Sequence, residues 1–249
     1  MIQGALEWLP VSSRGNVIVF MTNVMGLKAE EILSTSIYLH IGTALAAIIY
    51  YQKEVKMIIR REGKEGKALF NFLFISTIMT GMIGLPIYIL TESVTKVGET
   101  LLIIIGGALI LTGIIQKQSG KEGEKDSPKG FKQALILGIV QGFSAIPGLS
   151  RSGLTTSYML LKGTKTEVAF KLSFIMSIPA SIAASIGLVI LKGTTSFSSY
   201  TIISIICSFI VGLLTLKILV TFSKKSQFWK LCIVLGAIII LLNLPAIIL

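Results

Sequence analysis

Long, almost uninterrupted stretches of apolar residues recur along the chain. Six of them approach the roughly 20 apolar residues that a transmembrane helix needs. They lie at residues 33–52, 69–90, 100–116, 168–191, 200–222 and 228–248. Inside lipid a chain must satisfy its own backbone hydrogen bonds, which a helix does within one segment. The pattern therefore predicts an all-α integral membrane protein with six transmembrane helices.

Two further apolar stretches, residues 1–25 and 131–161, are each interrupted by a polar turn. The first turn reads PVSSRG from Pro10, and the second reads PGLSRSG from Pro147. The arms on either side are about 8–15 residues long, which is too short to cross a bilayer. These lengths favour two re-entrant helical hairpins in addition to the six spans.

The two interrupted stretches also resemble each other. Ile2-Gln3-Gly4 corresponds to Val140-Gln141-Gly142, and three apolar spans follow each hairpin. We interpret this as an internal repeat within one membrane domain, with residues 1–116 as the first half, 117–130 as a cytoplasmic linker and 131–249 as the second half. Matching interrupted segments in two halves indicate a binding site. The alternative is a chance similarity between two turns.

Composition and charge exclude other classes of protein and set the predicted topology. The chain is 53% hydrophobic and only 14% charged, with a formal net charge of +11, which excludes a soluble enzyme, a disordered chain or a nucleic-acid-binding module. Basic residues gather in 53–67 and 117–132, so these loops are predicted to be cytoplasmic. Because three spans separate the hairpins, they enter from opposite faces as an inverted-topology repeat. Both termini and the first hairpin's opening are then external.

The first interrupted stretch contains candidate catalytic residues. Gln3 and Glu7 are four residues apart and share a helix face, which Pro10 ends. The turn that follows supplies Ser13 as a further catalytic candidate, and the candidates for substrate binding in this stretch are Gln3, Ser12, Arg14, Gly15 and Asn16. An ionisable residue at membrane depth is a functional hypothesis by default. The alternative is that Glu7 is an interfacial residue beside Trp8.

The second turn predicts an oxyanion or phosphate cradle. It supplies Gln141, Ser150, Arg151, Ser152, Gly153 and Thr155. A helix starting near Ser152 would add backbone N–H donors, and a guanidinium suits phosphate oxygens. Together the two turns match phosphoryl transfer, with Glu7 as base or metal ligand, Ser13 as nucleophile and Arg151 as charge clamp. The alternative is that Arg151 extends to the cytoplasmic surface.

The chain also contains one histidine and two cysteines, for which the sequence favours structural roles. His40, the single histidine, is either a substitute base or a hydrogen-bonded histidine packed between spans, and the sequence favours the second. Cys207 and Cys232 lie in apolar runs, so a disulfide or a metal site is not expected.

These motifs resemble those of the undecaprenyl-pyrophosphate phosphatase family, also called the bacitracin-resistance protein family. Gln3-Gly-Ala-Leu-Glu7 is similar to its (E/Q)xxxE motif, and Pro147-Gly-Leu-Ser-Arg-Ser-Gly153 to its PGxSRSG motif. Pro10-Val-Ser-Ser-Arg-Gly-Asn16 is similar to PVSSxGH except at the last position. Segments 39–43 and 170–179 resemble further family segments, so the similarity covers nearly the whole chain.

The resemblance implies a membrane phosphatase that removes the terminal phosphate of a polyprenyl pyrophosphate and recycles the lipid carrier for cell-wall glycans. It implies a divalent cation, Mg²⁺ or Ca²⁺, with Glu7 as ligand, and a fold of six spans with two inverted re-entrant hairpins. It also assigns Gln3 and Glu7 to the acidic motif, Ser13 to the hydroxyl and Arg151 to pyrophosphate binding. Asn16 replaces the family's histidine and cannot act as a base, which favours Ser13 as nucleophile.

Other functions and several properties stay open at this point. The same inverted-repeat site could serve a flippase that moves a polyprenyl phosphate without chemistry, or a structural protein that keeps only the fold. The expected partners are the polyprenyl pyrophosphate lipid and the cell membrane, not nucleic acid. The sequence leaves the oligomeric state open, a dimer included. The active site is predicted to open to the external face.

Overall fold

A computed structural model describes residues 1–27, 29–95, 99–119, 124–126, 130–192, 199–222 and 228–243. Within these residues the regular structure is helical, apart from one isolated bridge between Lys125 and Thr164. The helices are α1 (Ile2–Leu6), α2 (Ser13–Met25), α3 (Ala29–Tyr50), α4 (Gln52–Ile59), α5 (Gly63–Thr95), α6 (Glu99–Gln118), α7 (Phe131–Gly142), the 3₁₀ turn η1 (Phe143–Ala145), α8 (Arg151–Leu161), α9 (Thr166–Lys192), α10 (Ser199–Phe222) and α11 (Phe228–Asn243).

Four of the described helices are long and apolar enough to cross a membrane. The qualifying stretches are Gly63–Thr91 in α5, Leu101–Gln118 in α6, Thr166–Leu191 in α9 and Thr201–Ile218 in α10. They coincide with four of the six predicted spans, so the chain is a multi-pass membrane protein. A count of six spans stays a prediction.

The other two predicted spans, 33–52 and 228–248, also form helices. Their apolar parts, Thr35–Tyr50 in α3 and Trp229–Asn243 in α11, are shorter than a full span within the described residues. Residues 244–248 of the last predicted span lie outside the described part of the chain.

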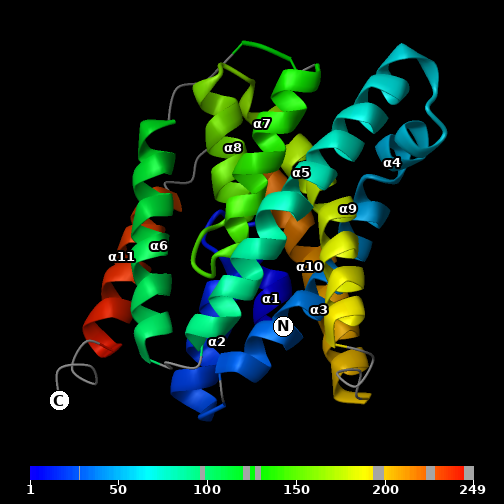
Figure 1. Ribbon diagram of the computed structural model, residues 1–249. Coiled ribbons are helices and arrows are strands. Elements are labelled where there is room, and N and C mark those ends of the chain that lie inside the picture. The colour runs from blue at the N-terminus through cyan, green and yellow to red at the C-terminus, as the bar shows by residue number, and fades with distance from the viewer. Residues whose placement is uncertain are drawn as a thin grey trace.

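The long helices pack in groups around the two interrupted segments. In Figure 1, α6 and α11 pair on one side, whereas α3, α9 and α10 gather on the other, and α5 crosses against α7. A β-carbon on Gly106 would lie only 2.8 Å from the Gly236 carbonyl oxygen. The α6–α11 pair therefore approaches at a distance that only glycine allows, as small residues commonly permit between membrane helices.

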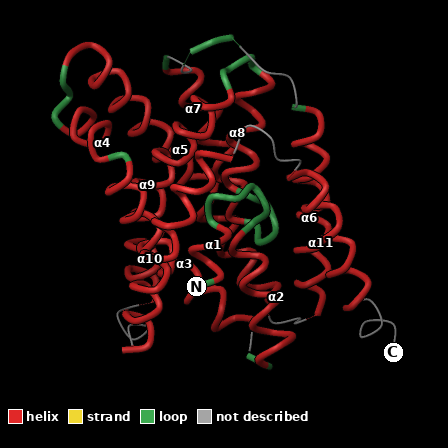
Figure 2. The backbone as a smooth tube through the Cα atoms, turned by 180° about the vertical axis from the view of Figure 1, so that it is seen from behind, coloured by secondary structure: helices red, strands yellow, loops and turns green. Residues whose placement is uncertain are grey.

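Each interrupted segment folds as a helical hairpin whose turn lies inside the molecule. The α1–α2 hairpin occupies the lower half of Figure 1, the α7–α8 hairpin occupies the upper half, and their turns meet between the two halves. Figure 2, seen from behind, shows loop segments at the centre of the molecule beside α1. The two turns touch, because a β-carbon on Gly15 would lie 2.9 Å from the Gly148 backbone nitrogen.

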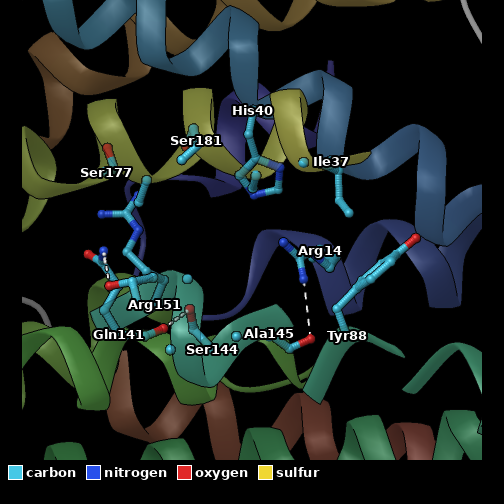
Figure 3. A pocket seen from close by; sticks show the side chains of 18 of the residues that line it. Arg14, Ile37, His40, Tyr88, Gln141, Ser144, Ala145, Arg151, Ser177 and Ser181 are labelled. Carbon is cyan, nitrogen blue, oxygen red and sulfur yellow. Dashed lines mark hydrogen bonds between the residues drawn. The ribbon is translucent and has the colours of Figure 1, made fainter. Parts of the chain in front are cut away.

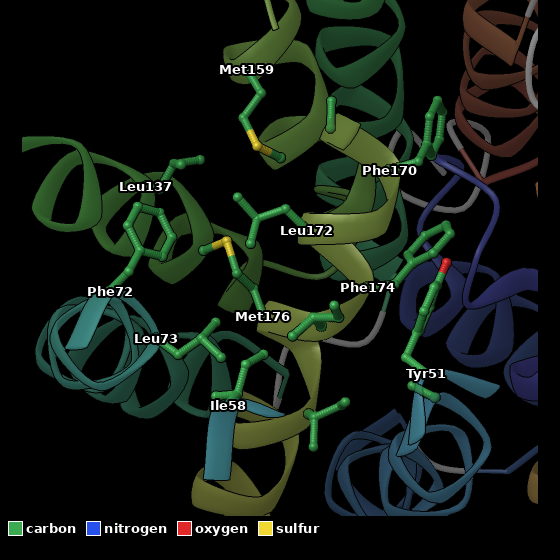
Figure 4. Close-up of a cluster of buried hydrophobic side chains, with 14 of the residues drawn as sticks. Tyr51, Ile58, Phe72, Leu73, Leu137, Met159, Phe170, Leu172, Phe174 and Met176 are labelled. Atoms are coloured by element: carbon green, nitrogen blue, oxygen red, sulfur yellow. The ribbon is translucent and has the colours of Figure 1, made fainter. Parts of the chain in front are cut away.

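A cluster of buried apolar side chains around α9 fixes the first hairpin in place (Figure 4). Trp8 is completely buried, and its ring meets Phe174 edge to face with centroids 5.2 Å apart. Its Nε1 donates a hydrogen bond of 2.7 Å to the Gly212 carbonyl oxygen in α10. The alternative that Glu7 lies beside an interfacial tryptophan is therefore wrong, since Trp8 anchors the turn within the protein.

The basic segments gather at one end of the molecule. The α4–α5 junction and the α8–α9 junction at Lys162 and Lys165 both lie at the top of Figure 1, whereas the α2–α3 junction lies at the bottom. Lys165 Nζ contacts Asp126 Oδ1 of the connecting segment at 3.0 Å. Segments that the charge pattern assigned to one side of the membrane are thus on one side of the protein. The division into two repeats stays a prediction.

Candidate active site

The two hairpin turns line a cavity of about 310 Å³ together with α3, α5 and α9. One part of its wall is polar and consists mainly of turn residues: Glu7, Ser12, Ser13, Arg14, Ser150, Arg151 and Ser152. The other part is formed by small and apolar residues of α5 and α9, such as Gly84, Leu85, Ala184 and Leu188. Figure 3 shows that side chains from both hairpins point toward this space.

The acid of the first hairpin and the arginine of the second form a buried ion pair. Arg151 Nη2 donates to Glu7 Oε1 at 2.6 Å, and Arg151 Nη1 donates to the Ser173 carbonyl oxygen of α9 at 2.9 Å. The side chains of Glu7 and Arg151 are only 5% and 14% exposed. This confirms that the two groups meet, and it contradicts the alternative that Arg151 extends to the cytoplasmic surface.

The candidate nucleophile donates to the same carboxylate. Ser13 Oγ donates a hydrogen bond of 2.7 Å to Glu7 Oε2. Gln3 Nε2 donates to Glu7 Oε2 at 2.6 Å and to Ser13 Oγ at 3.1 Å, which fixes both groups. A hydroxyl paired with a buried base that a third group orients is the arrangement of an activated nucleophile.

Both turns end in a serine-capped helix that begins at the cavity. The Ser12 side chain accepts from Gly15 N at 3.3 Å at the start of α2, and the Ser150 side chain accepts from Gly153 N at 3.1 Å at the start of α8. Helix N-termini carry partial positive charge and unpaired N–H donors. Two such ends facing one space favour a bound anion.

A second guanidinium lines the cavity without a carboxylate partner among the described residues. Arg14 Nη1 donates to the Ala145 carbonyl oxygen at 3.3 Å, across the contact between the two turns. In Figure 3 Arg14 lies between His40 and Tyr88, on a different side of the space from Arg151.

Gln141 occupies the wall beneath Arg151. It is 1% exposed, and its Nε2 donates to Thr80 Oγ1 of α5 at 3.0 Å. Its Oε1 has no hydrogen-bond partner among the described residues. Ser144 Oγ donates to the Gln141 carbonyl oxygen at 2.6 Å, which ties the start of the second turn to α7.

The structure places five predicted binding residues behind the cavity wall rather than on it, and one of them is Gln3, whose contacts with Glu7 and Ser13 are given above. Asn16 Nδ2 donates to the carbonyl oxygens of Val11 and Ser12 at 2.7 and 2.9 Å, so it holds the first turn closed. Thr155 Oγ1 shares a hydrogen bond of 2.7 Å with Ser173 Oγ. The other two are Gly15 and Gly153, where an added β-carbon would lie within 3.0 Å of Gly148 and Gln116 respectively.

His40 is hydrogen-bonded, as the preferred interpretation expected, but it also faces the site instead of only packing between helices. Its Nδ1 lies 2.7 Å from the Ser36 carbonyl oxygen, and its ring lines the cavity. Because a carbonyl oxygen only accepts, Nδ1 carries the proton of the neutral ring and Nε2 is an acceptor. Nε2 lies 3.1 Å from Gln3 Nε2 and 3.3 Å from Glu7 Oε2.

Sequence reasoning also missed the contribution of α9. Ser177 and Ser181 line the cavity, and Ser173 contacts both Arg151 and Thr155. Serines recur at every fourth position of this apolar helix, from Ser173 to Ser185, so they lie along one face. That spacing was the available signal, because a polar stripe on a membrane helix must face protein or water.

The residues around Glu7 do not fit a divalent cation. Mg²⁺ and Ca²⁺ take oxygen ligands. Among the described residues no group of three or more His, Cys, Asp and Glu side chains could hold a metal ion. Glu7 accepts from Arg151 on one oxygen and from Ser13 and Gln3 on the other. A cation at this carboxylate would have to share Oε1 with a guanidinium, and the two like charges would repel each other.

The chain matches the family described as bacitracin resistance protein BacA over residues 1–238. The undecaprenyl-diphosphatase of Methanococcoides burtonii is 37% identical over 253 residues, covering 97% of this chain and 94% of that protein. The undecaprenyl-diphosphatase of Haloarcula marismortui is 36% identical over 250 residues, covering 96% and 92%. That of Sulfurisphaera tokodaii is 32% identical over 254 residues, covering 98% and 94%. With its apolar spans and its site built from both interrupted motifs, the chain therefore belongs to the bacitracin resistance protein BacA family.

Proposed function

We propose that this protein is a membrane hydrolase that converts an undecaprenyl-type polyprenyl pyrophosphate into the monophosphate and inorganic phosphate. The observation that carries the proposal is the Ser13–Glu7–Arg151 chain of contacts, at 2.7 and 2.6 Å, within a cavity that is polar on one side and apolar on the other. Relatives named undecaprenyl-diphosphatase support this substrate. Product release would serve lipid-carrier recycling.

In the first half of the reaction Ser13 attacks the terminal phosphorus. Its hydroxyl proton passes to Glu7 Oε2, the Ser13 Oγ–phosphorus bond forms, and the bond from phosphorus to the bridging oxygen breaks. Polyprenyl monophosphate leaves and takes the proton from Glu7. Arg151 and the N–H groups at the starts of α2 and α8 stabilise the charge on the transferring phosphoryl group.

In the second half a water molecule attacks the phosphoserine. Glu7 accepts a proton from the water, phosphorus separates from Ser13 Oγ, and the proton returns to Ser13 as inorganic phosphate forms. Gln3 and His40 act as positioning residues. The Gln3 amide donates its two N–H groups to Glu7 and Ser13, and the His40 ring, held through Nδ1–H by the Ser36 carbonyl oxygen, lies against that amide with Nε2 3.1 Å from its nitrogen.

The lipid tail lies against α5 and α9. Their cavity-lining residues include glycines and alanines that leave space between the two helices: Gly81, Gly84, Ala180, Ala183, Ala184 and Gly187. Beyond this space α5 and α9 carry exposed apolar side chains, among them Ile89, Ile186 and Ile190, which suit contact with acyl chains. The isoprenoid chain therefore extends sideways into the bilayer while the pyrophosphate stays between the turns.

The membrane arrangement follows the sequence prediction: six spans, two inverted re-entrant hairpins, a cytoplasmic basic end and a site open to the outside. The common location of the basic junctions at one end of the molecule supports it. Arg60→Cys, in the α4–α5 junction, should react with an impermeant maleimide only after cells are opened. Labelling of intact cells would contradict this orientation.

The central test is phosphate release by the purified protein from undecaprenyl pyrophosphate. Glu7→Gln removes the base and should reduce release by about a thousand-fold, within the range reported for essential acid–base groups. Glu62→Gln is the matched control, because Glu62 is 55% exposed in a surface ion pair with Arg60. Equal rates for the wild type and Glu7→Gln would refute the mechanism.

A flippase is a second candidate, because two hairpins that meet midway between the ends of the molecule are also a carrier layout. It needs no nucleophile. Sealed vesicles containing Ser13→Ala protein distinguish the two functions. Translocation of polyprenyl phosphate that persists without phosphate release would favour the carrier.

A further inference from the structure

We propose that Arg14 is a second guanidinium for the substrate's diphosphate, and that Arg14 and Arg151 together bind this group without a divalent cation. The proposal rests on the proposed function and adds how the charge of the headgroup is neutralised. The proposal is based on two arginines, one from each hairpin, that line the same cavity. The carboxylate beside them, Glu7, already accepts hydrogen bonds on both oxygens.

The charges around the cavity leave one guanidinium uncompensated. Four of the described lining residues can carry charge: Glu7, Arg14, His40 and Arg151. Glu7 and Arg151 neutralise each other through their 2.6 Å contact. Arg14 forms no ion pair among the described residues and donates only to a main-chain carbonyl. An unpaired charge in a membrane interior is costly, so an anionic ligand would offset that cost.

A diphosphate needs positive charge at two places. Ser13, Glu7 and Arg151 form one group of contacts, where the terminal phosphate would react. In Figure 3 Arg14 lies on another side of the same space, next to Tyr88 on α5. It is thus placed for the phosphate that stays attached to the lipid. A planar guanidinium binds phosphate oxygens through two parallel N–H donors.

A second observation points to a ligand near Arg14. The Tyr88 side chain is 7% exposed and lines the cavity, yet its hydroxyl has no hydrogen-bond partner among the described residues. Buried hydroxyl groups are normally hydrogen-bonded. A phosphate oxygen held by Arg14 would give this donor an acceptor.

The cation implied by the family resemblance would neutralise the negative charge of the diphosphate, but the guanidinium that already contacts Glu7 would repel a cation there. Gln3 replaces a second carboxylate and turns its amide nitrogen toward Glu7. Both Glu7 oxygens already accept from donors, and one of these donors is a guanidinium. Arg14 therefore supplies the positive charge that a cation would otherwise bring.

The first measurement is phosphate release from undecaprenyl pyrophosphate after treatment with EDTA. The wild type should keep its rate within about twofold, and Arg14→Gln should lose about tenfold in kcat/KM, as expected for one charge-assisted phosphate contact. Arg14→Lys keeps the charge and should recover part of this loss. Arg60→Gln is the matched control, since Arg60 is 70% exposed.

The second measurement is the binding of inorganic pyrophosphate in EDTA, which does not require turnover. On a Ser13→Ala background, Arg14→Gln should weaken binding about tenfold, whereas Arg60→Gln should not. Thermal unfolding checks that each variant is folded, and Arg14→Lys is the second variant if Arg14→Gln is unstable.

The outcomes separate the two proposals. If EDTA abolishes wild-type release and Mg²⁺ restores it, the cation-free site is wrong and the phosphatase proposal stands. Unchanged pyrophosphate binding in both Arg14 variants overturns the role of Arg14. If no condition gives phosphate release, the proposed function fails, and the binding measurement still decides whether Arg14 contacts a diphosphate.

Discussion

The two hairpins are built alike but carry different chemistry. In each, a serine caps the helix and accepts from a glycine N–H three residues later: Ser12 from Gly15, and Ser150 from Gly153. These caps align Ser13, the first residue of α2, with Arg151, the first residue of α8. One helix start therefore presents the nucleophile and the other presents the clamp. One capped scaffold, used twice, thus positions two complementary groups at a single cavity.

The two hairpins differ in the backbone conformation of the capping serine. Ser12 has φ 56°, in the left-handed region, whereas Ser150 has an extended backbone with φ −75°. Asn16 hydrogen-bonds to the Val11 and Ser12 carbonyl oxygens, which secures this strained turn. The family's histidine position thus has a structural role here, while His40 of α3 supplies the imidazole at the site.

Replacing the first residue of α2 should give the largest effect. Ser13→Ala removes the attacking oxygen and should reduce phosphate release by about a thousand-fold or more, because no other group would form the covalent bond. Ser152→Ala removes a hydroxyl from the second position of α8 and should change the rate by less than about fivefold. Initial rates of phosphate release should be measured for both variants. Equal losses would contradict the assignment of the nucleophile to the first hairpin alone.

Replacing the first residue of α8 should have the next largest effect. Arg151→Gln removes the clamp and leaves Glu7 without its charged partner, so kcat/KM should fall by about a hundred-fold to a thousand-fold. Thermal stability should fall as well, because a buried carboxylate then lacks compensation. Kinetics and unfolding of the same preparation test this. A variant that loses stability but keeps its activity would make Arg151 a structural residue only.

The two caps should respond differently to glycine. Ser12→Ala should cost about 1 kcal/mol of stability through loss of the cap, whereas Ser12→Gly should cost only a few tenths, since glycine relieves the positive φ. Ser150→Gly should gain no such relief, because its φ is already favourable. Melting temperatures of Ser12→Ala, Ser12→Gly and Ser150→Gly, each compared with the wild type, would measure this. If glycine changed the melting temperature equally at both caps, the difference in φ between Ser12 and Ser150 would have no effect on stability.

The smallest expected effect on stability comes from an ion pair outside the hairpins, which serves as a reference for the buried Glu7–Arg151 pair. Lys171 Nζ contacts Glu54 Oε1 at 2.5 Å, with the Lys171 and Glu54 side chains 46% and 30% exposed. Burial raises the pKa of Glu54, but hydrogen bonds from Lys171 and the backbone, together with the charges of Lys171 and Lys53, outweigh this, so its pKa lies below the ordinary value. An exposed pair of this kind contributes at most about 0.5 kcal/mol.

The lowered pKa of Glu54 determines how the stability contribution of the Lys171–Glu54 pair depends on pH. The contribution is present above the unfolded-state pKa of Glu54 and is lost as the pH falls through the folded-state pKa. Glu54→Gln should therefore be slightly less stable than the wild type at neutral pH and equally stable in acid. Unfolding curves at several pH values check this, and a difference that grows in acid would contradict it.

The amino-acid sequence is enough to predict the long apolar helices, the two interrupted segments and the chemical groups on their turns, but residues 53–67, which are predicted to be a loop, contain most of α4 and the start of α5. Because a chain in lipid must form its backbone hydrogen bonds within each segment, hydropathy and the positions of Pro10 and Pro147 are enough to locate those elements. The meeting of Glu7 and Arg151 was also predictable, because two similar turns in opposite halves indicate a shared site.

Only the tertiary structure decided which side chains share that site. The alignment of Ser13 with Arg151 depends on where the caps begin α2 and α8, which local propensity does not locate to one residue. His40, Ser177 and Ser181 reach the cavity because α3 and α9 pack beside the turns, and Asn16 faces its own backbone instead. Contacts between residues as far apart as Glu7 and Arg151 depend on how whole helices pack, and a one-dimensional pattern of polarity does not contain that information.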